Sequence, residues 1–216
     1  MKVIVSLSGG IDSTTVLAHA LLLSEVQAVG FRYGSKHNEY ENRAAQAVAK
    51  HYGVSFRLID LTPVFDGFTS ALMKSGEEIP EGHYEDESMS KTVVPGRNII
   101  FSSVLSGVAW SVGASEVWLG IHSGDHAIYP DCRPGFYEAM AHAVKLGTGD
   151  RVNLKAPFLH VDKGEILKWG VEHDIPYHLT RTCYKDQELA CGKCGSCVER
   201  LEACASLGVD DPVRYE

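Results

Sequence analysis

The sequence lacks long hydrophobic runs. None of its apolar stretches approaches the roughly 18 residues that a membrane-spanning helix needs, so we expect no membrane partner. The first apolar run, Val3-Ile4-Val5, is also too short for the hydrophobic region of an export signal. We therefore expect a cytoplasmic protein whose six cysteines stay reduced.

Positive charge is scarce as well. The chain has 20 Lys and Arg residues against 28 Asp and Glu residues, which gives a formal net charge of −8. Proteins that bind a nucleic-acid backbone usually have the opposite balance, so we expect no nucleic-acid partner. With 44% hydrophobic and 22% charged residues, the 216-residue chain can bury a substantial core, which excludes a disordered or fibrous protein.

Short apolar runs alternate with helical patterns through most of the chain. The runs predict strands at 2–7, 26–31, 56–60 and 117–121, and the helical patterns lie at 12–23, 38–52, 97–112 and 162–172. The last helix begins at a capping-box pair, Asp162 and Glu165. This alternation predicts an α/β fold, a Rossmann-like parallel sheet with helices on both faces.

Two segments interrupt the alternation. Residues 62–95 are irregular and locally acidic (Glu77, Glu78, Glu81, Glu85, Asp86, Glu87), which fits either a functional lid or a solvated mobile loop. Residues 183–197 are rich in cysteine and glycine. We therefore predict a nucleotide-binding α/β domain at 1–175 and a small C-terminal zinc-binding segment at 176–216.

The hexapeptide Ser8-Gly9-Gly10-Ile11-Asp12-Ser13 lies between a predicted strand and a predicted helix. Its glycines let backbone N–H groups approach an anion, and the helix N-terminus adds partial positive charge. Asp12 would repel phosphate unless a cation such as Mg²⁺ lay between them. The pattern differs from G-x-x-x-x-G-K-[ST], and taken alone it also fits an ordinary glycine turn with a helix cap.

Four cysteines, Cys183, Cys191, Cys194 and Cys197, are separated by seven, two and two residues. Four thiolates can form a closed tetrahedral Zn²⁺ site, which this spacing favours. An iron–sulfur site and free thiols, including a redox pair, also remain open. Cys132 and Cys204 lie outside the spacing, and we expect Cys204 in the core on a following helix.

A third motif, Tyr129-Pro130-Asp131-Cys132-Arg133, follows the predicted strand at 117–121. Ligands of open α/β sheets bind beyond the carboxyl ends of strands, so this loop is well placed for binding. Tyr129 can stack on a flat ring, and Asp131 can accept two hydrogen bonds from a guanine-like edge. An acidic turn that contains a tyrosine fits the same residues.

The hexapeptide resembles the PP-loop of N-type ATP pyrophosphatases, which cleave ATP between its α and β phosphates. Over nearly the whole chain, the motifs together resemble the 7-cyano-7-deazaguanine synthase family of queuosine-precursor biosynthesis. The further motifs that support this are Tyr33-Gly34-x2-His37 with Tyr40 or Glu41 after it, Val94-Pro95-Gly96-Arg97-Asn98, the 129–133 loop and the four cysteines. The chain departs from the family pattern at Ile11 and at Ser35-Lys36, and the second departure can alter an active-site edge or a partner surface.

The resemblance implies an ATP-dependent, AMP-forming carbon–nitrogen ligase. Its substrates would be 7-carboxy-7-deazaguanine, ATP and ammonia, and its product would be the nitrile, made through adenylated intermediates and an amide. ATP would act with Mg²⁺, and a structural Zn²⁺ would be bound by the cysteines. A homodimer is also expected.

The same resemblance implies roles for individual residues. Ser8, Gly9, Gly10, Asp12 and Ser13 would bind pyrophosphate and Mg²⁺. Asp12, Ser13, Arg97 and Lys163 would be catalytic, although Arg97 can instead begin a helix and Lys163 can be a surface lysine. Tyr129 and Asp131 would hold the deazaguanine ring, Arg133 would pair with its carboxylate, and His122 and Asp125 would lie nearby. We interpret His37 as structural.

Several alternatives remain open from the sequence. A relative within the family could stop at the amide or transfer the activated base to another acceptor. Another PP-loop adenylating enzyme could act on tRNA, which the charge balance disfavours. A non-catalytic zinc module is the third alternative, and the intact hexapeptide argues against it.

Overall fold

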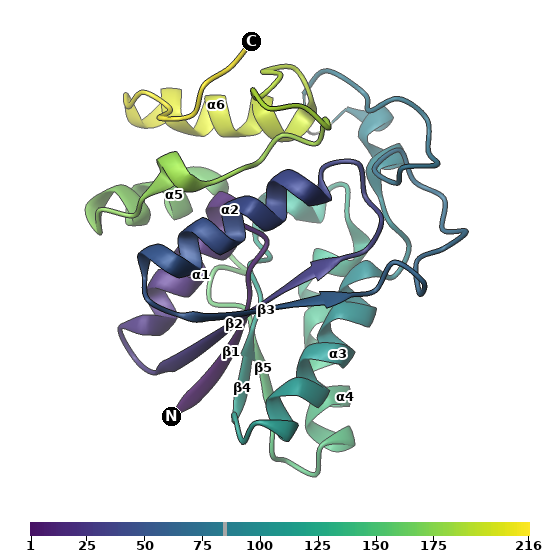
Figure 1. Cartoon of the computed structure of the whole chain (residues 1–216), viewed down its shortest axis with the longest axis vertical. Helices are drawn as coiled ribbons and strands as arrows, with labels where there is room; N and C mark the ends of the chain where they lie inside the picture. Colours follow the sequence, from purple (N-terminus) through teal and green to yellow (C-terminus); the bar gives the residue numbers. More distant parts are fainter. Residues whose placement is uncertain (84–85) are drawn as a thin grey trace.

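The fold is built on one parallel sheet of five strands, seen in a computed structural model that describes residues 1–83 and 86–216, without the side chain of His126 (Figure 1). The strands lie in the order β3-β2-β1-β4-β5. Their bounds are β1 Lys2–Ser6, β2 Glu25–Arg32, β3 Ser55–Asp60, β4 Glu116–Trp118 and β5 Asn153–Lys155. All four strand pairs are parallel, so the carboxyl ends of the strands meet at one edge.

Six α-helices surround the sheet in the part of the chain that the structure describes. They are α1 Ile11–Leu21, α2 Asn38–His51, α3 Arg97–Ser111, α4 Pro134–Gly147, α5 Lys163–Glu172 and α6 Gly195–Leu207. Helices α1 and α2 cover one face, while α3 and α4 cover the other (Figure 1). Helix α5 packs on α1, and α6 packs on α5. The predicted α/β fold with helices on both faces is confirmed.

Side chains of β1 alternate between two hydrophobic cores. Val3 and Val5 belong to the core under α1 and α2, and Ile4 belongs to the core under α3. All three side chains are fully buried, as expected for an inner strand with helices on both sides. Burying each such side chain contributes about 1.5–3 kcal/mol, so the inner strands hold the sheet rigid beneath the loops at its edge.

Most predicted elements are confirmed, with shifted ends. The strand predicted at 117–121 ends at Trp118, because the chain then turns toward the start of α1. A Cβ placed on Gly120 would lie 3.0 Å from the backbone nitrogen of Ser13. Helix α4 and strand β5 had no counterpart in the prediction. Among the described residues, no helix is long and apolar enough to cross a membrane.

Where the structure describes it, the irregular segment 62–95 packs against the rest of the molecule through hydrogen bonds and buried side chains. The Lys36 Nζ donates hydrogen bonds to the carbonyl oxygens of Ala71 and Gly76, at 3.0 and 3.1 Å. Phe65 and Leu72 are buried in the core under α3. The acidic residue Glu85 lies outside the described residues, so the expectation of a solvated acidic loop is not tested there.

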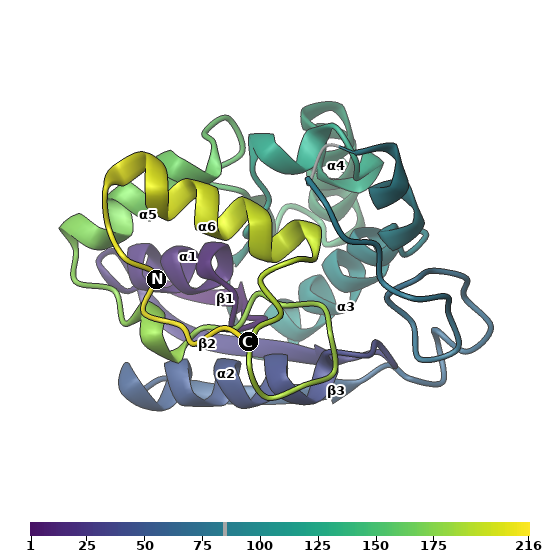
Figure 2. The same cartoon turned by 90° about the horizontal axis from the view of Figure 1, so that it is seen from above.

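The C-terminal segment lies against both this irregular segment and the sheet domain. Glu81 pairs as an isolated bridge with Cys194 and forms an ion pair with Lys185. Seen from above, the start of α6 lies beside the 62–95 segment (Figure 2). The four cysteines belong to the same core cluster as β4 and α3. The division at residue 175 stays a prediction.

Candidate active site

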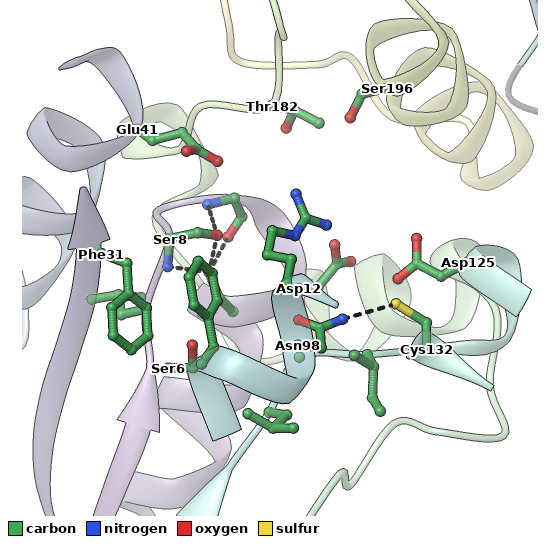
Figure 3. Close-up of a pocket in the computed structure, with 18 of the residues that line it drawn as sticks. Ser6, Ser8, Asp12, Phe31, Glu41, Asn98, Asp125, Cys132, Thr182 and Ser196 are labelled. Atoms are coloured by element: carbon green, nitrogen blue, oxygen red, sulfur yellow. Dashed lines mark hydrogen bonds between the residues drawn. The ribbon is translucent and has the colours of Figure 1, made fainter. Parts of the chain in front are cut away.

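The Ser8–Ser13 loop lies at the carboxyl end of β1 and leads directly into α1. Gly9 has a φ of +85°, and a Cβ there would lie 2.5 Å from the backbone nitrogen of Ala45, so only glycine fits between this loop and α2. The Ser13 Oγ accepts a hydrogen bond from the Ser8 backbone at 3.2 Å and lies 3.1 Å from the Ser8 Oγ. The loop therefore keeps a fixed shape beside a pocket that Ser8, Gly10 and Ser13 line. Figure 3 shows Ser8 in the wall of this pocket.

A line of alternating charges crosses the pocket beside this loop. The Nζ of Lys163 lies 2.8 Å from Asp12 Oδ2 and 3.2 Å from Glu199 Oε2. Burial opposes ionisation of Asp12, but the charge of Lys163 and its hydrogen bond hold the pKa of this carboxyl below the usual value. The pKa of Lys163 is raised, because Asp12 and Glu199 outweigh the effect of burial. Lys163 is therefore a buried, permanently charged lysine and not a surface residue.

His122 and Asp125 continue this polar wall. The His122 ring is fully buried, and its Nδ1 accepts a hydrogen bond from the Gly124 backbone at 3.1 Å. Its Nε2 lies 3.6 Å from Asp125 and 3.8 Å from Asp12. The structure thus places His122 between the two carboxylates, with Asp125 at the pocket surface.

Arg97 and Tyr129 form a second wall of the pocket. Arg97 is the first residue of α3, and its guanidinium carbon lies 5.8 Å from the centre of the Tyr129 ring. The Tyr129 hydroxyl lies 2.7 Å from Thr92 Oγ1 and 3.3 Å from the Tyr184 hydroxyl, so the ring is held firmly. This wall joins a cation to a flat aromatic surface, a combination that suits an anionic ligand with a planar ring.

Asp131 and Arg133 lie away from the pocket lining. The Asp131 Oδ2 accepts a hydrogen bond from the Asn98 backbone nitrogen at 2.8 Å, so it caps the start of α3. The Asn98 side chain donates in return to the Asp131 carbonyl and to Cys132 Sγ, which does line the pocket (Figure 3). Arg133 is exposed. Of the predicted ring-binding loop, the structure brings Tyr129 and Cys132 to the pocket.

The four cysteines lie together under the start of α6. Their sulfur atoms lie within 4.8 Å of one another, and all four residues are buried. Backbone N–H groups of Lys185 and Cys191 point at Cys183 Sγ, each at 3.4 Å. Hydrogen bonds with the thiols of Cys194 and Cys197 lower the pKa of Cys183, and the same hydrogen bonds raise the pKa of Cys194 and Cys197. The predicted cluster can hold a metal ion.

The segment that carries these cysteines also completes the pocket. Arg181, Tyr184 and Glu199 line it, and the Arg181 backbone nitrogen donates to the Gly9 carbonyl at 2.8 Å. The sequence interpretation missed these three residues, although Tyr184 follows Cys183 and Glu199 lies two positions after Cys197. From the sequence, these residues could have been identified only by assigning a functional role to the segment that carries the cysteines.

Helix α2 adds the carboxyl of Glu41, to which the sequence interpretation assigned no role. Glu41 lines the pocket on the side of Ser8, and its Oε2 lies 3.4 Å from Nε2 of the buried His37 (Figure 3). Burial raises the pKa of Glu41 to about 7, against the opposing charges of Arg97 and Arg181. Burial, with Arg97 beside it, lowers the pKa of His37 to about 3, so this ring is neutral at pH 7.

Comparisons with known proteins cover the whole chain. A family model described as queuosine biosynthesis protein QueC matches residues 2–208. A curated relative from Marinomonas sp., named 7-cyano-7-deazaguanine synthase, is 46% identical over all of this chain and 98% of its own length. A relative of the same name from Methanoregula boonei is 42% identical, and the match covers both chains completely.

Among solved structures, an NMN synthetase from Francisella tularensis matches 97% of this chain and 77% of its own, with 14% identity and a TM-score of 0.47. The match to the family model spans the Ser8–Ser13 loop, the pocket and the four cysteines. This chain therefore belongs to the QueC family of queuosine biosynthesis proteins.

Proposed function

We propose that this protein is a 7-cyano-7-deazaguanine synthase, an AMP-forming ligase that converts 7-carboxy-7-deazaguanine, ammonia and ATP to the nitrile. The observation that carries the proposal is the identity of 42–46% along the full length of relatives with that name. The pocket agrees with this chemistry, because a phosphate loop, buried cations and an aromatic wall meet at the carboxyl edge of the sheet.

ATP would lie with its pyrophosphate against the loop formed by Ser8, Gly9, Gly10 and Ser13. Asp12 Oδ1 is buried and has no hydrogen-bond partner among the residues that the structure describes, which fits a Mg²⁺ ligand. Mg²⁺ at this carboxylate would neutralise charge on the phosphates. Lys163 and Arg97 would add permanent positive charge on opposite walls, where negative charge develops during phosphoryl transfer.

The reaction needs positioning more than covalent help from the protein. A carboxylate oxygen of the substrate attacks the α-phosphorus, and pyrophosphate leaves. Ammonia then attacks the acyl carbon, and AMP leaves to give the amide. A second adenylation on the amide oxygen lets AMP depart again as the C≡N bond forms.

The deazaguanine ring would bind against Tyr129, between Arg97 and the Asp125–His122 wall. The predicted contacts of Asp131 with the guanine-like edge and of Arg133 with the carboxylate remain part of this proposal. The capping bond from Asp131 to Asn98 supports a role in holding this wall in place.

The four cysteines would hold a structural Zn²⁺. Zinc–sulfur bonds of about 2.3 Å place tetrahedral sulfurs roughly 3.8 Å apart, which agrees with the 4.0 Å between Cys191 and Cys197. All four ligands would come from the chain, so the ion would fix the segment that carries Tyr184 and Glu199.

We also propose a cytoplasmic homodimer. The six free cysteines fit a reducing compartment. Ile99 and Trp110 are exposed on α3 at a spacing of three helical turns, which supports a partner surface there. Light scattering of the purified protein tests the oligomeric state.

Mass spectrometry of the product made from 7-carboxy-7-deazaguanine, ATP and ammonium tests the main proposal. We expect the nitrile, with two AMP and two pyrophosphate released per molecule and no ADP. An amide as the end product with one AMP, or modification of tRNA in place of the free base, would show that a different family activity is correct.

A further inference from the structure

Glu41 is the one acidic side chain of α2 that reaches the pocket. Its backbone carbonyl lies 2.8 Å from the position that a Cβ on Gly9 would take, so the residue sits directly on the phosphate loop. Its side chain is 20% exposed and faces the pocket beside Ser8, opposite Asp125 and Cys132 (Figure 3). With ATP and the substrate bound as in the proposed function, a carboxyl in this place would lie near the phosphates and the substrate group that joins them.

The groups that face Glu41 come from four parts of the fold. His37 precedes it on α2, Tyr33 follows β2, Arg97 begins α3, and Arg181 belongs to the C-terminal segment. The two arginines favour the ionised carboxylate, but burial outweighs them and raises the pKa of Glu41 to about 7. The neutral His37 lies within 3.4 Å of both Glu41 and the Tyr33 hydroxyl, so it holds the carboxyl without neutralising it.

The chemistry of the proposed function needs a proton acceptor here. Ammonia exists mainly as ammonium at neutral pH, and the nitrogen must lose a proton before or as its lone pair attacks the acyl-adenylate. In the last step the adenylated amide loses its remaining N–H proton while the C–O bond to AMP breaks and the C≡N bond forms. Arg97 and Lys163 are permanent cations and cannot accept these protons.

We propose that Glu41 is the catalytic base that accepts protons from the reacting nitrogen, both from ammonium and from the adenylated amide. The inference rests on the proposed function above. In each step the nitrogen keeps the electron pair of its N–H bond, the carboxylate of Glu41 takes the proton, and water receives the proton between turnovers. A base with a pKa near the working pH is efficient in this role.

Glu41→Gln tests the inference, because the change keeps the shape and removes the ionisable group. ATP–pyrophosphate exchange with 7-carboxy-7-deazaguanine, measured without ammonium, reports adenylation alone and should stay within about threefold of the wild type. Amide formation with ammonium should fall by about 10²-fold or more at pH 7. Glu39→Gln is the matched control, since Glu39 lies two residues away on the exposed side of α2 and pairs with Arg43.

The pH profile separates a base from a binding group. Expressed per concentration of ammonium, the wild-type rate of amide formation should rise with pH and level off above about pH 7, where Glu41 is ionised. The Glu41→Gln rate should keep rising with pH, because it depends on free ammonia. If Glu41→Gln lost ATP–pyrophosphate exchange as strongly as amide formation, the role of Glu41 as a base would be wrong. The same would follow if the variant kept the wild-type pH profile and changed only the KM for ammonium. If the wild-type protein showed no ATP–pyrophosphate exchange with 7-carboxy-7-deazaguanine, the proposed function and the inference would both be wrong.

Discussion

The two oxygens of Asp12 have different surroundings. Oδ2 binds Lys163, whereas Oδ1 is buried without a hydrogen-bond partner among the described residues. A buried carboxylate oxygen is costly to leave unpaired, so such an atom points to a ligand that the chain itself does not provide. Lys163 in turn depends on Asp12 and Glu199, since a lone buried ammonium would be strongly destabilising.

Asp12→Ala should lower the rate of pyrophosphate release by at least ~10²-fold, the scale of losing one electrostatic stabiliser. The rate constant for pyrophosphate release at saturating ATP measures the loss. The variant should also unfold at lower denaturant concentration, because Lys163 loses its nearest anion. A variant with normal turnover would show that the metal and phosphates are held elsewhere.

At the scale of elements, the start of α3 depends on a residue 33 positions later in the chain. Asp131 caps this helix through the Asn98 backbone nitrogen, and Arg97, the residue before Asn98, projects into the pocket. The hydrogen bond therefore fixes the direction in which Arg97 enters the site.

Asp131→Ala should cost about 1–2 kcal/mol in the free energy of unfolding, because α3 loses its cap. Asp131→Asn keeps an oxygen acceptor and should be nearly as stable as the wild type. If the carboxylate also binds the guanine-like edge, Asp131→Asn should still raise the KM for the base while ATP binding stays nearly unchanged. Denaturant unfolding tests the capping role, and separate titrations of ATP and the base test the binding role. If Asp131→Asn binds the base as tightly as the wild type does, capping is the role of Asp131 that remains.

The cysteine segment should depend on its metal. Cys194→Ser should lose one equivalent of zinc per chain and increase hydrogen exchange across residues 181–199, because Arg181, Tyr184 and Glu199 are carried by this segment. Elemental analysis and exchange mass spectrometry measure both effects. Cys204→Ser is the control, since Cys204 is buried in the other core. A brown protein that contains iron would contradict the assignment of zinc.

The sequence predicted most elements that have a regular apolar pattern. Strand β5 was missed because three residues are too few for a clear period. Helix α4 was missed although Tyr137, Met140, Ala141 and Val144 have helical spacing and pack on the core, so its pattern was present in the sequence. The Ser8–Ser13 motif and the cysteine cluster could be recognised because close spacing in the chain defines them, and the phosphate-binding role of the loop stays a prediction. Glu199, Tyr184 and Glu41 reach the pocket only through tertiary packing, which local patterns do not encode.

At the scale of the whole molecule, the buried His37 and the partly buried Glu41 oppose each other in the pH dependence of their contributions to stability. His37 has a pKa of about 3 in the folded protein against 6.5 when unfolded, so its contribution to stability is lost as the pH falls below 6.5. Glu41 has a pKa of about 7 against 4.5 when unfolded, so its contribution is lost as the pH rises toward 7. Between pH 4.5 and 6.5 the two slopes have opposite signs and largely cancel.

Glu41→Gln removes the pH dependence that Glu41 contributes and leaves that of His37. As the pH falls from 6.5 to 4.5, the free energy of unfolding of this variant should fall more steeply than that of the wild type, by up to about 1.4 kcal/mol per pH unit. Denaturant unfolding at several pH values measures the slopes, and Glu39→Gln should follow the wild type. Parallel curves for Glu41→Gln and wild type would show that Glu41 ionises normally in the folded protein.

The backbone hydrogen bond from Arg181 to Gly9 joins two residues that are 172 positions apart in the sequence. A ribosome makes Gly9 and all five strands, the last of which ends at Lys155, before it makes Arg181, so the nascent chain can form its sheet before the pocket is complete. A chain cut short before residue 181 would lack Arg181, Tyr184, Glu199 and the whole cysteine cluster. Every strand of the sheet would still be present in such a fragment, but the pocket would be missing one of its walls.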